Sequence, residues 1–188
     1  KVQAIINWFS AENSKISDPP AIGIVGYHEG GLIAFYAAAL DQRIQATLVS
    51  GYFSERNRVW EEPIYRNVFG LLEQFGDAEI ASLISPRSLV VEHSEIPEIK
   101  APPPPRKGRS GGAAPGILKT PPFKSVNAEY ERAMKLAAKN TQMALVTADD
   151  DQALDTFGSD PALETLLQML QVTSVKGWKS TPPPTKKL

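Results

Sequence analysis

The sequence predicts an α/β domain with a partial, doubly wound parallel sheet. Four short apolar runs alternate with helix-like segments along the 188 residues. Short runs of this kind are typical of strands buried on both faces, and their alternation with helices is typical of a parallel sheet. The third observation is a glycine-rich turn directly after the first run. In such sheets ligands bind beside the carboxyl ends of the strands, so this turn is the first place to look for a site.

The first half of the chain contains two of the predicted strands. Residues 2–9 carry apolar side chains at helical spacing. The run Ile-Gly-Ile-Val at 22–25 is the first predicted strand, and the almost wholly apolar stretch at 32–40 is the helix that follows it. The second predicted strand is at 46–49. We expect the two strands to lie parallel, with the helix packed on the sheet.

The second half repeats the alternation. Its predicted elements are, in order, helices over 62–75 and 77–84, a strand over 89–91, a helix over 125–139, a strand over 143–147 and a helix over 161–170. Asp77, Ser125 and Asp160 are the predicted helix caps. Three aromatic residues at helix-like spacing favour a core role over a platform for stacking substrate: Trp60, Tyr65 and Phe69.

Proline and glycine mark the domain organisation. We predict one partial α/β domain over residues 1–173, with a Pro/Gly-rich insertion at about 95–123, and a Lys/Pro-rich tail or linker at 174–188. The insertion holds four consecutive prolines, Pro102 to Pro105, which favour an extended polyproline II conformation. The rest of the chain has the periodicity of an ordinary globular domain.

Composition excludes several classes of function. Lys and Arg total 20 against 21 for Asp and Glu, so a net charge of −1 gives no general attraction to nucleic acid or an anionic membrane. The absence of cysteine excludes a disulfide framework, a thiolate metal site and a cysteine nucleophile, and is compatible with any compartment. No apolar run approaches the roughly 18 residues that span a bilayer. We therefore expect no nucleic-acid or membrane partner and no cofactor.

The turn after the first strand has the frame Gly-x-His-x-Gly. This is the frame of a nucleophile elbow, in which the middle residue adopts unfavourable backbone angles between a strand and a helix. Glycines on either side avoid collisions, and the N–H groups of the helix N-terminus can hold an oxyanion. Gly26 and Gly30 fill the glycine positions, and the apex with its two neighbours is Tyr27, His28 and Glu29.

Two stretches carry a family resemblance. Residues 20–44, P-A-I-G-I-V-G-Y-H-E-G-G-L-I-A-F-Y-A-A-A-L-D-Q-R-I, resemble α/β-hydrolases of the dienelactone hydrolase and acetyl xylan esterase type. Residues 77–91, D-A-E-I-A-S-L-I-S-P-R-S-L-V-V, are similar to the same family's approach to its acid-bearing strand. The similarity covers residues 1–95 well and 125–171 loosely. It implies the C-terminal half of an α/β-hydrolase fold and, for an active enzyme, a small ester or acyl substrate.

The sequence departs from this family at the catalytic positions. His28 stands where the resemblance places a serine nucleophile, and the family's acid falls at or near Glu92. The family's histidine would lie in residues 148–160, which contain none. The resemblance also implies that the family's first strands, with a loop that donates the second oxyanion N–H, precede Lys1. A Ser-His-Asp relay is therefore not expected in the family's positions.

Three interpretations follow. The first is a hydrolase-like domain whose own triad is degenerate. The second is an active hydrolase with a rearranged site, built where the strands end; its candidate residues are His28, Glu92 and His93, with a possible acid cluster of Asp149, Asp150 and Asp151. The third is a non-catalytic interaction module whose Pro-rich insertion is the ligand of an aromatic groove.

Two further expectations concern the ends of the strands and the edge of the sheet. Consecutive aspartates after a strand are more typical of a solvated turn than of a metal site, so we expect no bound metal. Ser50 and Ser94 also end strands, but neither has a free histidine partner in the sequence pattern. The strand at 22–25, normally central, would be an apolar unpaired edge of a four-stranded remnant. We expect self-association through this edge.

Overall fold

A computed structural model describes residues 1–103, 105–111 and 115–172. The predicted tail at 174–188 lies outside the described residues, as do residues 104 and 112–114 of the predicted insertion. Across the described residues, no helix combines the length and the apolar character needed to cross a membrane.

A four-stranded, all-parallel sheet forms the centre of the molecule, with the strand order β1-β2-β3-β4. This confirms the predicted α/β class and the parallel sheet. Every strand but the last is longer than its apolar run, because pairing extends into flanking residues. The strands are β1 (Ile22–Tyr27), β2 (Ile44–Ser50), β3 (Ser88–Glu92) and β4 (Met143–Val146).

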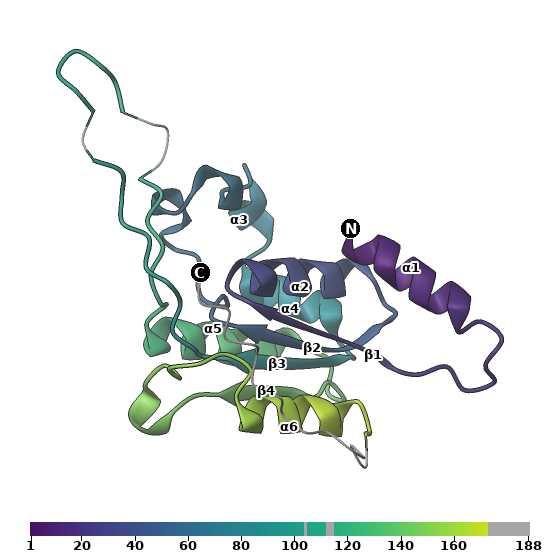
Figure 1. Ribbon diagram of the computed structural model, residues 1–188. Helices are drawn as coiled ribbons and strands as arrows, with labels where there is room; N and C mark the ends of the chain where they lie inside the picture. Colours follow the sequence, from purple (N-terminus) through teal and green to yellow (C-terminus); the bar gives the residue numbers. More distant parts are fainter. Residues whose placement is uncertain (104, 112–114, 173–188) are drawn as a thin grey trace, which may run out of the picture.

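Helices cover both faces of the sheet, as Figure 1 shows. One face carries α2 (Glu29–Leu40), α4 (Asp77–Ile84) and α5 (Phe123–Leu136), which share the larger apolar core with the sheet. The opposite face carries α6 (Asp160–Met169), which packs on β2, β3 and β4 around Leu48 and Val90. The N-terminal helix α1 (Val2–Glu12) lies near β1 on the α2 side, with Ile6 in the larger core.

The predicted burial of strands on both faces is right for the inner strands and wrong for β1. All residues of β3 are buried, and in β2 only Gln45 is exposed. In β1, Gly23 and Val25 are exposed. The two residues face the α6 side of the sheet, where Leu170 lies beside Gly23 but α6 itself packs on the other three strands. Strand β1 is thus an edge strand that is half covered.

The single helix predicted over 62–75 is wrong. The chain instead forms two 3-10 turns and one short α-helix: η1 (Val59–Glu61), η2 (Ile64–Arg66) and α3 (Leu71–Gln74). Pro63 precedes η2 in an extended conformation, and Gly70 precedes α3 with φ +72°, which an α-helix does not allow.

The predicted core role of the three aromatic residues is also wrong. Trp60, Tyr65 and Phe69 are 58%, 63% and 100% exposed. The three residues do not share one helix, because two 3-10 turns and a short α-helix take the place of the predicted helix. The side chain of this segment that is buried is a charged one, Arg66.

All three predicted caps are displaced by a residue or more. Helix α5 begins at Phe123, and the Ser125 hydroxyl accepts the N–H of Glu55 at 3.2 Å instead of capping. Helix α6 is capped by the Ser159 side chain, with Asp160 as its first residue. Asp77 is likewise the first residue of α4 and lies after the cap position.

The predicted insertion leaves the sheet after β3 and projects away from the body of the molecule, as Figure 1 shows. Its two arms are joined at the base, where Ile99 and Leu118 exchange backbone N–H···O bonds of 2.9 Å. Beyond that point residues 101–103 and 105–111 are exposed. None of its described residues belongs to either of the two apolar clusters.

Candidate functional site

The strand-to-helix turn after β1 has the backbone of an elbow. His28 adopts φ 53° and ψ −111°, a region that residues with a side chain rarely occupy. Its N–H donates to the Ser50 carbonyl of β2 at 2.9 Å, and its carbonyl accepts the N–H of Leu32 at 3.1 Å. The prediction of a strained apex at the start of α2 is confirmed.

The glycines of the turn differ in what they allow. A Cβ at Gly26 would lie 2.0 Å from the Gly30 carbonyl oxygen, so no side chain fits there. A Cβ at Gly30 would meet no atom within 4 Å, and the prediction that this glycine is also required is wrong. The second glycine at which a side chain would be crowded is Gly31, where a Cβ would lie 3.0 Å from the Ser50 carbonyl oxygen. Sequence reasoning missed Gly31 because the elbow pattern counts two residues from the apex.

The His28 imidazole is largely enclosed. Its side chain is 15% exposed, and Nε2 is buried without a hydrogen-bond partner among the described residues. Burial lowers the pKa of His28 below its ordinary value, and the nearby Arg66 guanidinium lowers it further, against the opposing charges of Glu29 and Glu62. The ring is therefore mainly neutral at pH 7.

Glu29, the neighbour of the apex, is engaged elsewhere. Its Oε1 lies 4.0 Å from His28 Nε2, beyond hydrogen-bond distance. The same oxygen accepts the Tyr65 hydroxyl at 2.8 Å and Arg66 Nε at 3.0 Å. Its place in the first turn of α2 also suits the helix dipole. A carboxylate held in this way does not orient the imidazole.

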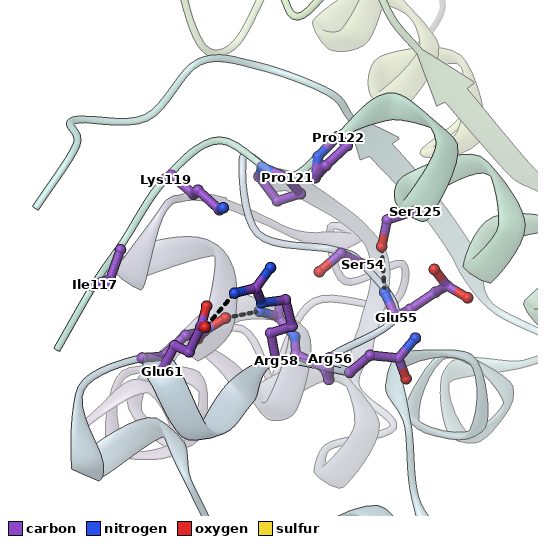
Figure 2. A pocket seen from close by; sticks show the side chains of 12 residues that line it. Ser54, Glu55, Arg56, Arg58, Glu61, Ile117, Lys119, Pro121, Pro122 and Ser125 are labelled. Carbon is purple, nitrogen blue, oxygen red and sulfur yellow. Dashed lines mark hydrogen bonds and ion pairs between the residues drawn. The ribbon is translucent and has the colours of Figure 1, made fainter. Parts of the chain in front are cut away.

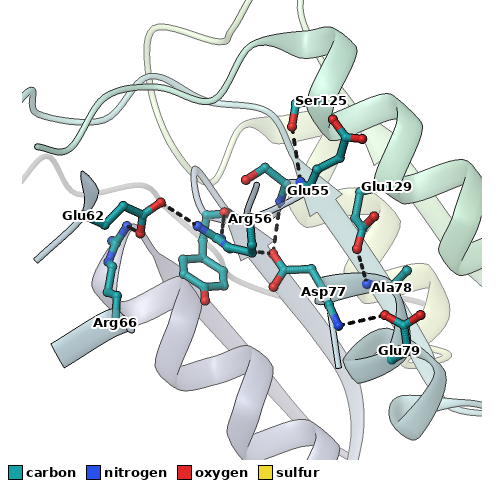
Figure 3. A network of polar contacts seen from close by, with 12 residues as sticks. Glu55, Arg56, Glu62, Arg66, Asp77, Ala78, Glu79, Ser125 and Glu129 are labelled. Carbon is teal, nitrogen blue, oxygen red and sulfur yellow. Dashed lines mark hydrogen bonds and ion pairs between the residues drawn. The ribbon is translucent and has the colours of Figure 1, made fainter. Parts of the chain in front are cut away.

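A largely buried ion-pair network runs from Arg66 to Asp77, as Figure 3 shows. Arg66 Nη1 donates to Glu62 Oε2 at 3.0 Å, and Glu62 Oε1 lies 3.3 Å from Arg56 Nη1. Arg56 Nε in turn donates to Asp77 Oδ2 at 3.0 Å. Burial raises the pKa of Asp77 to about 6, with Arg56 partly offsetting it. Sequence reasoning missed this network, because no local spacing relates its members.

Glu92, the predicted acid, ends β3 and is fully buried. Its Oε2 accepts the N–H of Gly158 at 2.7 Å. Its Oε1 accepts the N–H and the hydroxyl of Ser159 at 2.8 and 2.7 Å. These three bonds fix the loop between β4 and α6, so the carboxylate serves as an internal anchor with a full set of donors.

His93, the second predicted histidine, is also bound internally. Its Nε2 lies 2.9 Å from the Pro121 carbonyl oxygen, which accepts only, so Nε2 carries a proton. Its Nδ1 lies 3.4 Å from the Thr147 hydroxyl, which itself donates to the Gln152 carbonyl at 2.6 Å. The ring thus connects β4 with the chain that returns from the insertion.

The candidate residues of the predicted rearranged site lie at the ends of two strands, β1 and β3, that are not neighbours in the sheet. In the sheet register, Tyr27, Ser50 and Glu92 lie in one row across three strands. Strands are about 4.8 Å apart, which separates the backbones of the first and third by roughly 10 Å. Among the described residues His28 forms no hydrogen bond or ion pair with Glu92 or His93.

The predicted acid cluster lies apart from the other candidates. Asp149, Asp150 and Asp151 form an exposed 3-10 turn after β4, with positive φ at the last two. Within the described ranges, no three His, Asp or Glu side chains converge as ligands of a metal ion. The Ser50 and Ser94 hydroxyls form a buried pair 2.7 Å apart, and in the described part of the chain neither hydroxyl has a histidine or carboxylate partner.

A pocket of about 310 Å³ opens beside the return of the insertion, and Figure 2 shows it. Neither His28 nor Glu92 lines it. Its charged side chains are of both signs, and the exposed Arg58 forms an ion pair with the largely enclosed Glu61. The lining includes Ser54, Arg56, Arg58, Glu61, Lys119 and Ser125. This balanced lining does not define a ligand class.

A functional interpretation rests on three features: the geometry of the turn, the sheet and the enclosed carboxylates. Comparisons with protein-family models, curated proteins and solved structures found no match.

Proposed function

We propose that this chain is a hydrolase-like α/β domain, related to carboxylic-ester hydrolases, that does not hydrolyse esters at its elbow. The observation that carries the proposal is the elbow backbone at His28, with φ 53°, occupied by an imidazole and not a hydroxyl. A strained strand-to-helix apex is costly to keep and is typical of sites where a reactive side chain is displayed.

The surroundings of the apex support loss of acyl transfer. A histidine that acts as base or nucleophile needs a partner that fixes its tautomer and stabilises its charge. His28 Nε2 has no hydrogen-bond partner among the described residues, and Glu29 is held by Tyr65 and Arg66. The lowered pKa of His28 further disfavours the imidazolium that such a mechanism would form.

The other family positions support the same proposal. Glu92 has the location expected of the family's acid, but its two oxygens bind Gly158 and Ser159. Glu92 therefore binds Ser159, the cap of α6, in the loop where the resemblance would place a histidine. We infer a fold retained for stability and binding, with its acyl-transfer chemistry lost.

The experiment is hydrolysis of p-nitrophenyl acetate and p-nitrophenyl butyrate by the purified chain and by His28→Ala. We expect no saturable turnover from either, and no burst of p-nitrophenol. A matched control is Glu98→Gln, an exposed carboxylate outside the turn. Saturable turnover that His28→Ala removes, with the thermal transition retained, would contradict the proposal and favour an active site built on His28.

The projecting insertion supports a second candidate function, an interaction module. Pro102, Pro103 and Pro105 are exposed and the base of the arm is joined by the Ile99–Leu118 bridge, so the arm is presented away from the cores. Exposed proline runs dock into aromatic grooves of SH3 and WW domains. Binding to a panel of such domains should be lost when residues 101–116 are replaced by a short Gly-Ser linker, with the thermal transition unchanged. Binding that survives the replacement would exclude this arm.

A further inference from the structure

The insertion tip, residues 105–111, concentrates positive charge at the end of the projecting segment. Arg106, Lys107 and Arg109 follow one another closely, and the tip contains no Asp or Glu. Every residue of the tip is exposed. Figure 1 shows this part of the insertion far from the sheet and its helices. Within the described part of the chain none of the three cations forms an ion pair, so all three are available to a partner.

The backbone of the insertion tip is held by very little. Lys107 and Gly108 form a turn, which is closed by a bond from the Arg109 N–H to the Arg106 carbonyl at 3.0 Å. Gly108 supplies the positive φ of this turn, +84°. Among the described residues the tip makes no other backbone hydrogen bond and contributes to neither apolar cluster. The turn can therefore open into an extended conformation without disturbing the cores.

Other exposed cations are held by regular structure or lie beside it. Lys124 and Lys135 are exposed but belong to α5, whose backbone hydrogen bonds would have to break before a protease could bind it. Lys15 comes nearest to the tip in character. It lies in the exposed loop after α1, inside a turn closed by the Ile16 N–H and the Asn13 carbonyl at 3.0 Å. It is a single cation near a helix end, whereas the tip offers three at a projecting turn.

We propose that the insertion tip is a processing site, at which a protease specific for Lys and Arg cleaves the chain after Arg106, Lys107 or Arg109. Proteases of this class bind the side chain before the cleaved bond in a pocket with a carboxylate at its base. Water is the co-reactant: its oxygen bonds to the carbonyl carbon, the C–N bond breaks, and the products are a carboxylate and an ammonium group. Exposed loop tips are the preferred sites of such cleavage.

Contacts across the cut hold the two pieces together. Strand β3, in the first piece, pairs in parallel with β4, in the second. The N–H of Ala78 donates to Glu129 Oε1 at 2.7 Å, which joins α4 to α5. Val126 and Leu166 of the second piece belong to the larger and the smaller apolar cluster, respectively. Cleavage therefore converts the chain into a two-chain protein with the same fold.

The base of the insertion stops the cut from spreading into the sheet. Ile99 and Leu118 exchange two backbone hydrogen bonds of 2.9 Å, one residue from each side of the cut. The Ile96 N–H donates to the Thr120 hydroxyl at 3.1 Å. The new chain ends are thus free only beyond this bridge, and the strand that precedes the insertion keeps its place.

The first experiment is limited digestion of the native chain with trypsin, with the fragments identified by intact mass. Among the bonds of residues 1–172, we expect the first cut after Arg106, Lys107 or Arg109. The variant with all three changed, Arg106→Gln/Lys107→Gln/Arg109→Gln, should lose its first intact-chain band at least about tenfold more slowly, because the remaining bonds wait for a local opening.

The matched control is Lys124→Gln/Lys135→Gln, which removes exposed cations from a helix and leaves the insertion tip unchanged. It should be cut at the same bonds and at the same rate as the unmodified chain. A first cut after Lys15, or a triple variant that is cut as fast as the unmodified chain, would overturn the proposal.

The second experiment tests whether the cut protein stays one body. Denaturing electrophoresis should show two fragments, while sedimentation velocity shows the mass of the whole chain and circular dichroism an unchanged spectrum. Fragments that separate in native buffer, or that trypsin degrades as fast as they form, would contradict the two-chain protein. The inference goes beyond the proposed function, because neither ester turnover nor binding to an aromatic groove enters either readout.

Discussion

The carboxylate of Glu92 binds Ser159 twice, with the backbone N–H at 2.8 Å and the hydroxyl at 2.7 Å on the same oxygen. Ser159 in turn caps α6, its side chain accepting from the N–H of Ala162. The end of β3 and the start of α6 are thereby joined through one buried acid. A residue that the family resemblance assigns to catalysis is thus a structural anchor in this fold.

Glu92→Gln should destabilise the fold. The amide offers only one accepting atom, so the N–H of Gly158 or of Ser159 loses its partner in a buried position. The expected loss is about 1–3 kcal/mol of unfolding free energy, measured by urea denaturation. Amide exchange at Gly158 and Ser159 should become faster. Glu98→Gln, at an exposed position, is the control, and equal stability of the two variants would contradict the anchoring role.

Alanine at the two glycines of the elbow should have opposite effects. Gly26→Ala places a Cβ 2.0 Å from the Gly30 carbonyl oxygen, between backbone segments that cannot yield, and should prevent folding. Gly30→Ala meets open space in the first turn of α2 and should be neutral or stabilising, by up to about 1 kcal/mol. Circular dichroism and thermal unfolding measure both. Severe loss of structure in Gly30→Ala would show that the turn is packed differently.

Comparing glycine with alanine at position 28 should reveal backbone strain. With φ 53° and ψ −111°, any side chain at this position is held in a sparsely populated region, at a cost of about 1–3 kcal/mol. Both His28→Gly and His28→Ala lose the imidazole, so their difference isolates the backbone. We expect His28→Gly to be the more stable of the two in urea denaturation. Equal stabilities would mean that the apex relaxes when the ring is removed.

The buried Asp77 should make stability depend on pH in an unusual direction. Burial raises the pKa of Asp77 to about 6 from an ordinary 3.8, so the folded state takes up a proton more readily than the unfolded chain. Its contribution is therefore fully present below about pH 4 and is lost as pH rises through 6, an effect on the order of 3 kcal/mol. Asp77→Asn should remove this slope when unfolding free energy is measured at several pH values.

Glu79 provides an internal control for that measurement. Its hydrogen bonds with Arg132 hold the pKa of Glu79 at about 2, well below the ordinary 4.5. Its stabilisation is present above pH 4.5 and lost as pH falls toward 2, and solvent screening reduces it because the side chain is 28% exposed. Glu79→Gln should therefore change the pH profile only in the acid range. A slope between pH 4 and 6 that survives Asp77→Asn would contradict the assignment to Asp77.

Much of the fold could be predicted because it depends on local pattern. The apolar runs at 22–25, 46–49 and 89–91 became strands, and the small-residue stretch at 32–40 became a helix. The prediction failed at 62–75, where helical spacing of apolar residues coexists with Pro63 and Gly70. Pro63 and Gly70 favour non-helical backbone, and in this segment their preference outweighed the helical spacing of the apolar residues.

For the candidate site, sequence by itself determined the elbow. A strand, a glycine that admits no Cβ and a helix follow one another within a few residues, and their sterics force the strained backbone of His28. Only the tertiary structure decided what the polar groups do. Glu92 meets Ser159 from 67 residues away, and Glu29 meets Arg66 from 37. A buried carboxylate binds whichever donors packing brings within reach, and no local spacing encodes that choice.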